Sequence, residues 1–78
     1  MKPELFHATN HPPSAAARRR VVELGLVPRI RFRNIFYPEV QADFTARGGQ
    51  RLPALWNGAT LIQGEEDVVA ALEALSAG

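Results

Sequence analysis

The chain has 78 residues, of which 46% are hydrophobic, and its nine Lys or Arg and eight Asp or Glu residues give a formal net charge of +1 at pH 7. This length allows one domain, for which we take residues 1–78, and so small a charge gives no strong field towards nucleic acid. Cysteine is absent, which excludes disulfides, thiolate zinc sites and thiol–disulfide exchange by the chain itself.

The sequence also shows no membrane-spanning segment, no signal peptide and no metal-binding motif. No apolar run approaches the roughly 20 residues that span a bilayer, and residues 1–4 lack the apolar region of a signal peptide. We therefore expect a cytoplasmic protein with no membrane partner. The two histidines, His7 and His11, are separated by the end of an expected strand and have no obvious third ligand, so we expect no metal site.

The first elements are expected to be a strand and a helix. Residues 4–8 form a short apolar strand that ends in turn formers at 9–10. A helix from about Ser14 to Leu24 follows. Ser14 is a possible N-cap, although the helix could equally begin at Pro12 or Pro13, since proline suits a first helical turn. Gly25 then supplies the residue type that most often terminates a helix.

Residues 29–34 alternate between arginine and other side chains without a break. In a strand, Ile30 and Phe32 would face one side, and Arg29, Arg31 and Arg33 the other. A strand buried on both faces would not tolerate three arginines, so we expect this one at a sheet edge. The three arginines could dock an acidic protein partner, or they could simply protect an exposed edge.

The second half of the chain predicts a helix, a hairpin and a last helix. The helix begins at Pro38 and ends at Gly48-Gly49. Two apolar strands, at residues 54–56 and 60–62, flank Asn57-Gly58, a dipeptide typical of tight hairpin turns. We expect Trp56, in the first of these strands, to lie in the core. The last helix begins near Glu65.

The complete order is therefore β-α-β-α-β-β-α, an α/β fold. We expect a four-stranded mixed sheet in which the first two strands are parallel and the last two antiparallel, with helices on both faces.

Three segments in this order resemble glutaredoxins, which have a thioredoxin-like fold, and the whole chain from about residue 4 to 76 is also similar to the N-terminal domain of glutathione transferases. His11-Pro12-Pro13-Ser14 occupies the place of the Cys-Pro-x-Cys dithiol. Arg51-Leu52-Pro53 is similar to a Thr-Val-Pro segment whose proline is cis, and residues 63–68 are similar to a Gly-Gly-x-Asp-Asp-Leu segment. Residues 21–26 resemble the Leu-Glu-x-x-Gly-Leu of the transferases.

The resemblance implies a glutaredoxin-type thioredoxin-like fold and a ligand-binding site. It implies that Leu52, before a cis Pro53, offers its backbone to glutathione or to an extended peptide. It further implies that Glu66 and Asp67 receive the γ-glutamyl end of glutathione, with the backbone N–H of Glu65 nearby. Glutathione is thus a possible ligand, and no cofactor is required.

The expected function is binding without redox chemistry. A cysteine-free domain cannot act as a dithiol oxidoreductase, so we expect a peptide or a glutathione-like molecule to bind in a groove beside Pro53. The alternative is a transferase-like domain in which His11 or Ser14 polarises a thiol. In that alternative the two residues are candidate catalytic groups. Otherwise His11 is an exposed loop residue and Ser14 a simple helix cap.

Two further surfaces carry arginine residues that could contact a partner. Arg18, Arg19 and Arg20 form a solvated helix face without interleaved aromatic residues, so we do not expect nucleic acid to bind there. A second alternative function is a protein-interaction module that uses the arginine-bearing edge strand.

Overall fold

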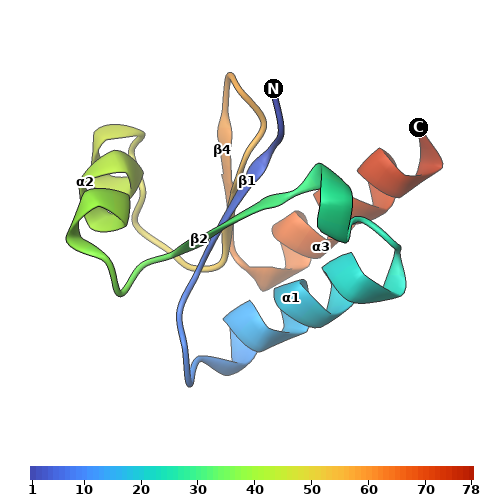
Figure 1. Cartoon of the computed structure of the whole chain (residues 1–78), viewed down its shortest axis with the longest axis horizontal. Helices are drawn as coiled ribbons and strands as arrows, with labels where there is room; N and C mark the ends of the chain where they lie inside the picture. The colour runs from blue at the N-terminus through green and yellow to red at the C-terminus, as the bar shows by residue number, and fades with distance from the viewer.

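The computed structural model describes every residue from 1 to 78 and contains a four-stranded sheet with helices on both of its faces (Figure 1). The strands run in the order β2-β1-β3-β4, with β1 and β2 parallel and the other two pairs antiparallel. The expected element order and mixed sheet are confirmed. In chain order the elements are β1 (Glu4–His7), α1 (Pro12–Glu23), the short 3-10 helix η1 (Val27–Arg29), β2 (Arg31–Asn34), α2 (Pro38–Ala46), β3 (Ala54–Trp56), β4 (Leu61–Gln63) and α3 (Glu65–Ala77).

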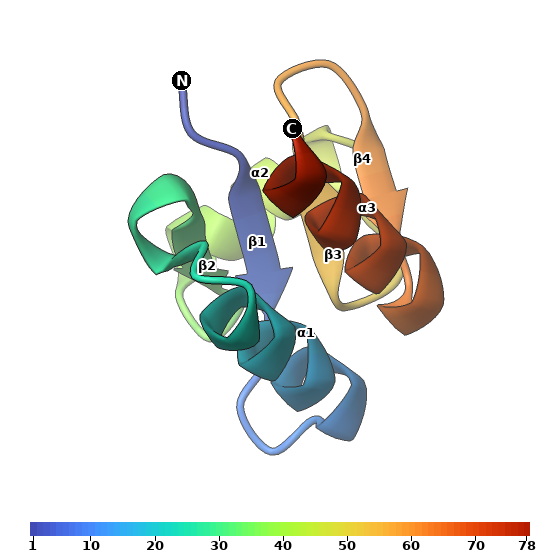
Figure 2. The ribbon, with the colours of Figure 1, turned by 90° about the vertical axis from the view of Figure 1, so that its right-hand side faces the viewer.

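The helices divide the interior into two apolar clusters. Figure 2 shows α1 and α3 side by side on one face of the sheet, with α2 behind the sheet on the other face. Successive strand residues point to opposite faces, so Leu5 of β1 belongs to the larger cluster beneath α1 and α3, and Phe6 to the smaller one beneath α2. Trp56 is only half-buried and packs against the smaller cluster.

Helix α1 begins at the first of the three starts that the sequence left open and ends where expected. Its first residue is Pro12, and His11 rather than Ser14 is the N-cap. At the other end, Gly25 has a φ of +67°. The Gly25 N–H donates to the Val22 carbonyl (3.0 Å) and the N–H of the following residue, Leu26, to that of Val21 (2.9 Å). This double closure is a Schellman motif, which requires the left-handed backbone that glycine adopts at little cost.

The hairpin between β3 and β4 is confirmed, but its connection is longer than the two-residue turn expected from Asn57-Gly58. Trp56 pairs with Leu61, so four residues make the loop. The side-chain oxygen of Asn57 accepts from the N–H groups of Ala59 (2.9 Å) and Thr60 (2.8 Å). An asparagine that caps its own loop in this way does not need the positive φ of a tight turn.

Strand β2 lies at a sheet edge, as expected, but its arginines do not share one environment. Arg29 belongs to η1 and Arg31 is exposed, whereas Arg33 is buried, with 7% of its surface accessible. The expectation that three arginines project together from this strand is therefore wrong. The alternating pattern correctly predicted the strand. It could not predict that the side chain of Arg33 pairs with a buried carboxylate.

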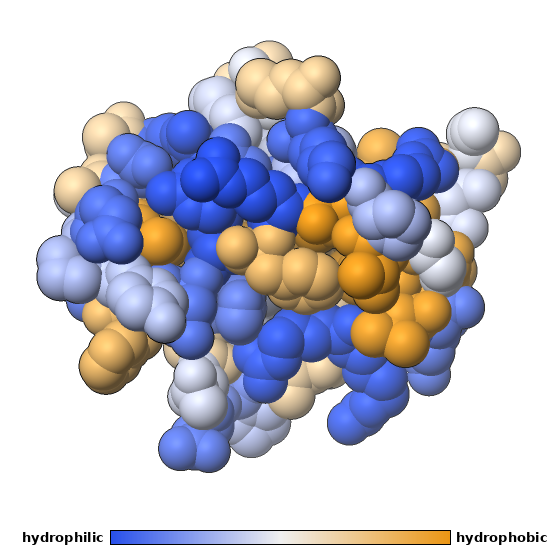
Figure 3. Space-filling view, viewed as in Figure 1, coloured by the Kyte–Doolittle hydropathy of each residue, from blue (hydrophilic) through white to orange (hydrophobic).

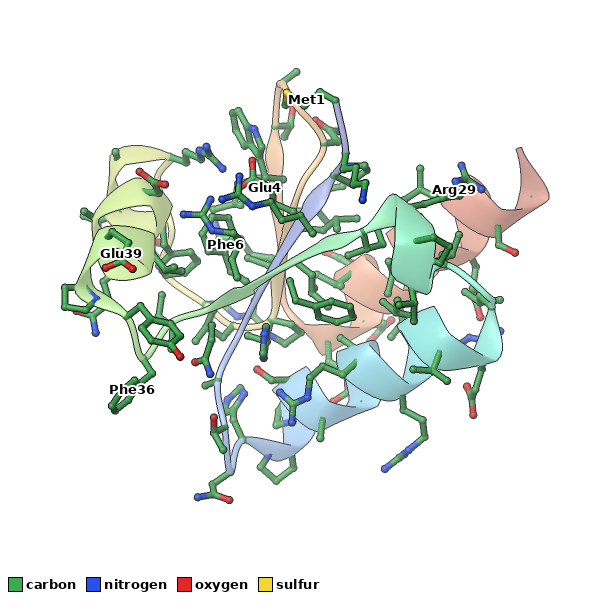
Figure 4. All side chains as sticks on the ribbon, viewed as in Figure 1. Met1, Glu4, Phe6, Arg29, Phe36 and Glu39 are labelled. Atoms are coloured by element: carbon green, nitrogen blue, oxygen red, sulfur yellow. The ribbon has the colours of Figure 1, made fainter.

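That carboxylate is Glu4 of β1, which no sequence pattern singled out. Arg33 forms ion pairs with Glu4 and, at 2.7 Å, with Asp43 of α2, and Arg47 Nη1 lies 3.2 Å from Glu4 Oε2. Glu4 and Phe6 both point towards α2 in Figure 4. The guanidinium groups of Arg33 and Arg47 also lie 5.4 Å and 5.7 Å from the centre of the Phe6 ring. These charged residues join α2 to the sheet, and we call them the α2 ion cluster: Glu4, Arg33, Asp43 and Arg47.

The α2 ion cluster holds its carboxyls in the charged form. Burial raises the pKa of Glu4, but the hydrogen bonds and charges of Arg33 and Arg47 outweigh it and leave this pKa below its ordinary value. A hydrogen bond from Arg33 lowers the pKa of Asp43. A carboxyl whose pKa is lowered by folding stabilises the fold above its unfolded-chain pKa, and this contribution is lost as the pH falls through the lowered value.

We predict that Glu4→Gln destabilises the chain by about 3 kcal/mol at pH 7, because it leaves buried guanidinium charge without its partner. Denaturant unfolding at pH 7 and at about pH 3, below the ordinary range of carboxyl pKa values, measures both the loss and its dependence on pH. The difference from the unaltered chain shrinks in acid. Glu39→Gln, at an exposed position in the first turn of α2, costs less than about 1 kcal/mol. Equal losses in the two variants would contradict the role of the cluster.

Candidate ligand-binding groove

A groove runs between the start of α1, the loop before β3 and the outer side of α3. It has a volume of about 790 Å³ and is open to solvent. The sequence-predicted residues Leu52, Glu65 and Glu66 all line it, whereas Asp67 lines a smaller hollow of about 250 Å³ at the start of α3. Arg51 and Glu66 border both hollows, which therefore adjoin. The other residues of the larger groove are Pro13, Val69, Ala70 and Glu73.

The loop before β3 presents the backbone of Leu52 without using it. The peptide bond between Leu52 and Pro53 is cis, as expected, and Pro53 is fully buried. The residues on either side are fixed: the Arg51 N–H donates to the side-chain oxygen of Gln63 (2.9 Å), and the Pro53 carbonyl accepts from the Gly64 N–H (2.9 Å). No hydrogen bond within the chain uses the N–H or carbonyl of Leu52 itself.

The start of α3 carries a second set of unused donors. Gly64 is the N-cap and provides no side chain, and the first helical hydrogen bond runs from Val68 N–H to the Gly64 carbonyl (3.0 Å). The N–H groups of Glu65, Glu66 and Asp67 therefore have no acceptor in the chain. Free N–H groups at a helix start attract anions, and the helix dipole adds to this effect.

Arg51 is the groove residue that sequence reasoning missed. A Cβ atom at Gly64 would lie 2.8 Å from Arg51 Nη2, so the guanidinium passes directly over the N-cap of α3. Arg51 forms no ion pair in the chain. Its position just before Leu52-Pro53, together with a glycine at the helix start, is the signal that could have assigned it.

The charges around the groove are suited to a ligand that carries both signs. Arg51 and the free N–H groups of α3 favour a carboxylate, while Glu66 and Asp67 favour an ammonium group. Glu73 is already paired with Arg20 at 2.8 Å across α1 and α3. Glu65 places one more negative charge beside the carboxylate position, which weakens the attraction.

His11 and Ser14 form a closed hydrogen-bonded unit at the start of α1. Ser14 Oγ lies 2.8 Å from His11 Nδ1 and accepts from the Ala8 N–H (3.1 Å), while the Ser14 N–H donates to His11 Nδ1 (3.2 Å). Because Nδ1 accepts from that N–H, it carries no proton in this arrangement, and the serine hydroxyl donates to it. The unit joins the end of β1 to the first turn of α1.

Neither of these two residues lines the groove. Ser14 is fully buried, and His11 is half-buried at a separate hollow beside Arg18 and Arg19. Arg18 is itself engaged, since it donates to the Ala8 carbonyl at 2.9 Å and lies 3.1 Å from His7 Nδ1. The structure thus brings together the ligand-binding candidates on the loop and α3, and leaves the two candidate catalytic residues apart from them.

No cluster of three or more His, Asp or Glu side chains is arranged to hold a metal ion. No helix has the length and apolar character that crossing a membrane requires.

Comparison with known proteins leaves the family open. The chain matches no protein-family model, and no curated protein is similar to it.

We predict that Ser14→Ala destabilises the chain by about 1 to 3 kcal/mol, because the partly buried Ala8 N–H loses its acceptor. His11→Ala removes the helix cap and costs about 1 kcal/mol, whereas His11→Asn retains a capping oxygen and costs less. Denaturant unfolding measures all three variants, with the exposed Ser76→Ala in α3 as the control. A Ser14→Ala variant as stable as the Ser76→Ala variant would contradict the hydrogen-bonded unit.

Proposed function

We propose that this chain is a thioredoxin-like domain of the glutaredoxin type that has no redox activity and binds the end of a peptide, or a glutathione-like molecule, in the groove beside Pro53. The order β-α-β-α-β-β-α, the strand order β2-β1-β3-β4 and the cis Pro53 support this fold assignment. The absence of cysteine removes the thiol chemistry of such a scaffold.

The unused backbone of Leu52 is the observation that carries the proposal. Its neighbours on both sides are fixed by hydrogen bonds, so its N–H and carbonyl are held in position beside the groove. An extended ligand can pair with such a donor and acceptor as an added strand would, and this pairing is independent of side-chain identity.

The start of α3 supports one direction for the bound ligand. A carboxylate that follows the extended part would accept from the free N–H groups of Glu65 and Glu66 and from Arg51. An ammonium group on the same end would be held by Asp67 and Glu66 in the adjoining hollow. The γ-glutamyl end of glutathione carries both groups on one carbon, and this supports a glutathione-like ligand over a peptide with a single terminal charge.

The transferase-like alternative has less support from the geometry. The hydroxyl of Ser14 is buried and committed to His11, and His11 lies at a different hollow from Leu52. Neither His11 nor Ser14 is therefore positioned to polarise a thiol that is bound in the groove.

We predict that titration with glutathione, followed by amide chemical shifts, perturbs Leu52, Glu65 and Glu66. Arg51→Ala weakens binding by at least about fivefold, because a charge-assisted hydrogen bond to the carboxylate is lost. Arg19→Ala, which removes an exposed and unpaired charge on α1, leaves the affinity unchanged.

Two related ligands separate the parts of this proposal. S-methylglutathione retains both ends and should bind equally well, since no residue in the groove requires the thiol. The tripeptide with an ordinary α-linkage moves the ammonium group and should bind more weakly. If none of the three ligands perturbs Leu52 or Glu65, the groove does not bind this class of molecule.

The scaffold assignment has a test of its own. We predict that the double variant His11→Cys/Ser14→Cys acquires a thiol of lowered pKa at the start of α1 and gains disulfide reductase activity with glutathione. His11→Cys alone shows how much of the activity needs the second thiol. A double variant that folds and forms no internal disulfide would contradict a redox-type scaffold.

A further inference from the structure

The exposed apolar side chains of the molecule gather along one segment. Six large hydrophobic residues are exposed, and all except Met1 lie between residues 22 and 37, the stretch that contains β2 and its flanks. Figure 3 looks onto the β2 edge of the sheet and shows apolar surface in the middle of this face, bordered by hydrophilic surface. We call the surface along this strand the β2 edge surface; the exposed large apolar side chain of β2 itself is Phe32.

The backbone along this edge has unpaired groups. The N–H groups of Arg31 and Ile35 donate to the carbonyls of Pro3 and His7, so these alternate residues face β1. In a parallel pair the residues between them face away from the partner strand. The N–H and carbonyl of Phe32 and the N–H of Asn34 therefore point to the open side, where no strand lies beyond β2.

The two faces of the edge differ in chemistry. Phe32 pairs with Leu5 and lies on the α1 side, where its ring meets that of His7 edge-on. Arg31 pairs with Glu4 and lies on the α2 side. Arg31 is exposed and has no ion-pair partner. A strand added here would meet an apolar surface with one set of side chains and positive charge with the other.

These charges argue against a second copy of the chain as the occupant. Two β2 strands that pair antiparallel would bring the unpaired Arg31 of both copies onto one face, where like charges repel. The opposite edge of the sheet, β4, has no exposed large apolar side chain to offer. The complementary strand is therefore one that alternates acidic and apolar residues.

We propose that the β2 edge surface binds an extended acidic segment of a partner protein, which adds a fifth strand beside Phe32. Carboxylates of the segment pair with Arg31, and its apolar side chains on the other face cover Phe32. Backbone hydrogen bonds to Phe32 and Asn34 fix the register. This surface lies apart from the groove at Leu52, so the two bind independently.

An acetylated and amidated peptide of alternating valine and glutamate tests the proposal. Its addition should shift the amides of Phe32 and Asn34 and leave those of Leu52 and Glu65 in place. Arg31→Glu should weaken binding about tenfold, because an attraction becomes a repulsion. Arg19→Glu makes the same charge change at an exposed site on α1 and should alter the affinity less than twofold.

Three outcomes would overturn the proposal. A peptide N-methylated at alternate residues retains every charge but cannot pair along its methylated side. If the peptides methylated in either register bind as well as the parent, the attraction is electrostatic and no strand is added. If a peptide with lysine in place of glutamate binds equally well, the positive charge of Arg31 plays no part in binding. If sedimentation finds a dimer whose formation shifts Phe32, the edge belongs to a second copy.

Discussion

The side-chain amide of Gln63 fixes the loop on which the proposed function depends. Its oxygen accepts from the N–H groups of Gln50 and Arg51, at 2.8 Å and 2.9 Å, and its nitrogen donates to the Gly48 carbonyl at 3.3 Å. One residue of β4 thereby braces the whole connection from α2 to β3. The consequence is that Leu52 is held in place by its neighbours while its own backbone groups form no bond.

The two faces of the sheet are held by different physical interactions. Under α1 and α3 the contacts are almost entirely apolar, around Leu5, Val21 and Leu72. Under α2 a small apolar cluster is supplemented by charged groups that are buried together. Such a cluster contributes less to stability than an apolar core of equal size, because burying charge costs solvation. The ion pairs form in only one arrangement of the charged groups, however, and this arrangement sets the position of α2 on the sheet.

Much of the fold followed from local sequence signals. Proline and glycine marked the ends of α1 and α2, the alternation around Phe32 indicated the edge strand, and the apolar runs of the hairpin gave β3 and β4. These features depend on interactions within a few residues, so a single sequence records them. The thioredoxin-like arrangement remains a proposal, supported by the strand order and by the positions of Pro53 and the helix starts.

Some of the features that the sequence did not predict depend on pairs distant in the chain, and others on local hydrogen bonds of side chains with several possible partners. The burial of Arg33 follows from Glu4, which lies in another strand, and the loop length after Trp56 follows from the way Asn57 caps its own turn. His11 is the helix cap because its Nδ1 accepts from the Ser14 N–H, while Ser14 Oγ accepts from the N–H of Ala8. The place of Arg51 in the groove depends on α3, because its guanidinium lies over the N-cap of that helix.

The Leu52 groove and the β2 edge surface share one physical principle. In each, backbone donors and acceptors that folding leaves unpaired lie beside charge of a defined sign. A chain without reactive thiols can still recognise partners by this combination, since hydrogen bonding provides the register and charge provides the selection. The two surfaces lie on opposite parts of the sheet, one at the loop before β3 and the other along β2.

Amide hydrogen exchange at Leu52 tests the central claim most directly. The Gly64 N–H, which donates to Pro53 within the chain, is the internal reference. We predict that Leu52 exchanges rapidly in the free chain while Gly64 is protected, and that saturating glutathione slows Leu52 at least tenfold with Gly64 unchanged. A Leu52 amide that is already protected in the free chain, or that exchanges at the same rate with and without the ligand, would contradict the account.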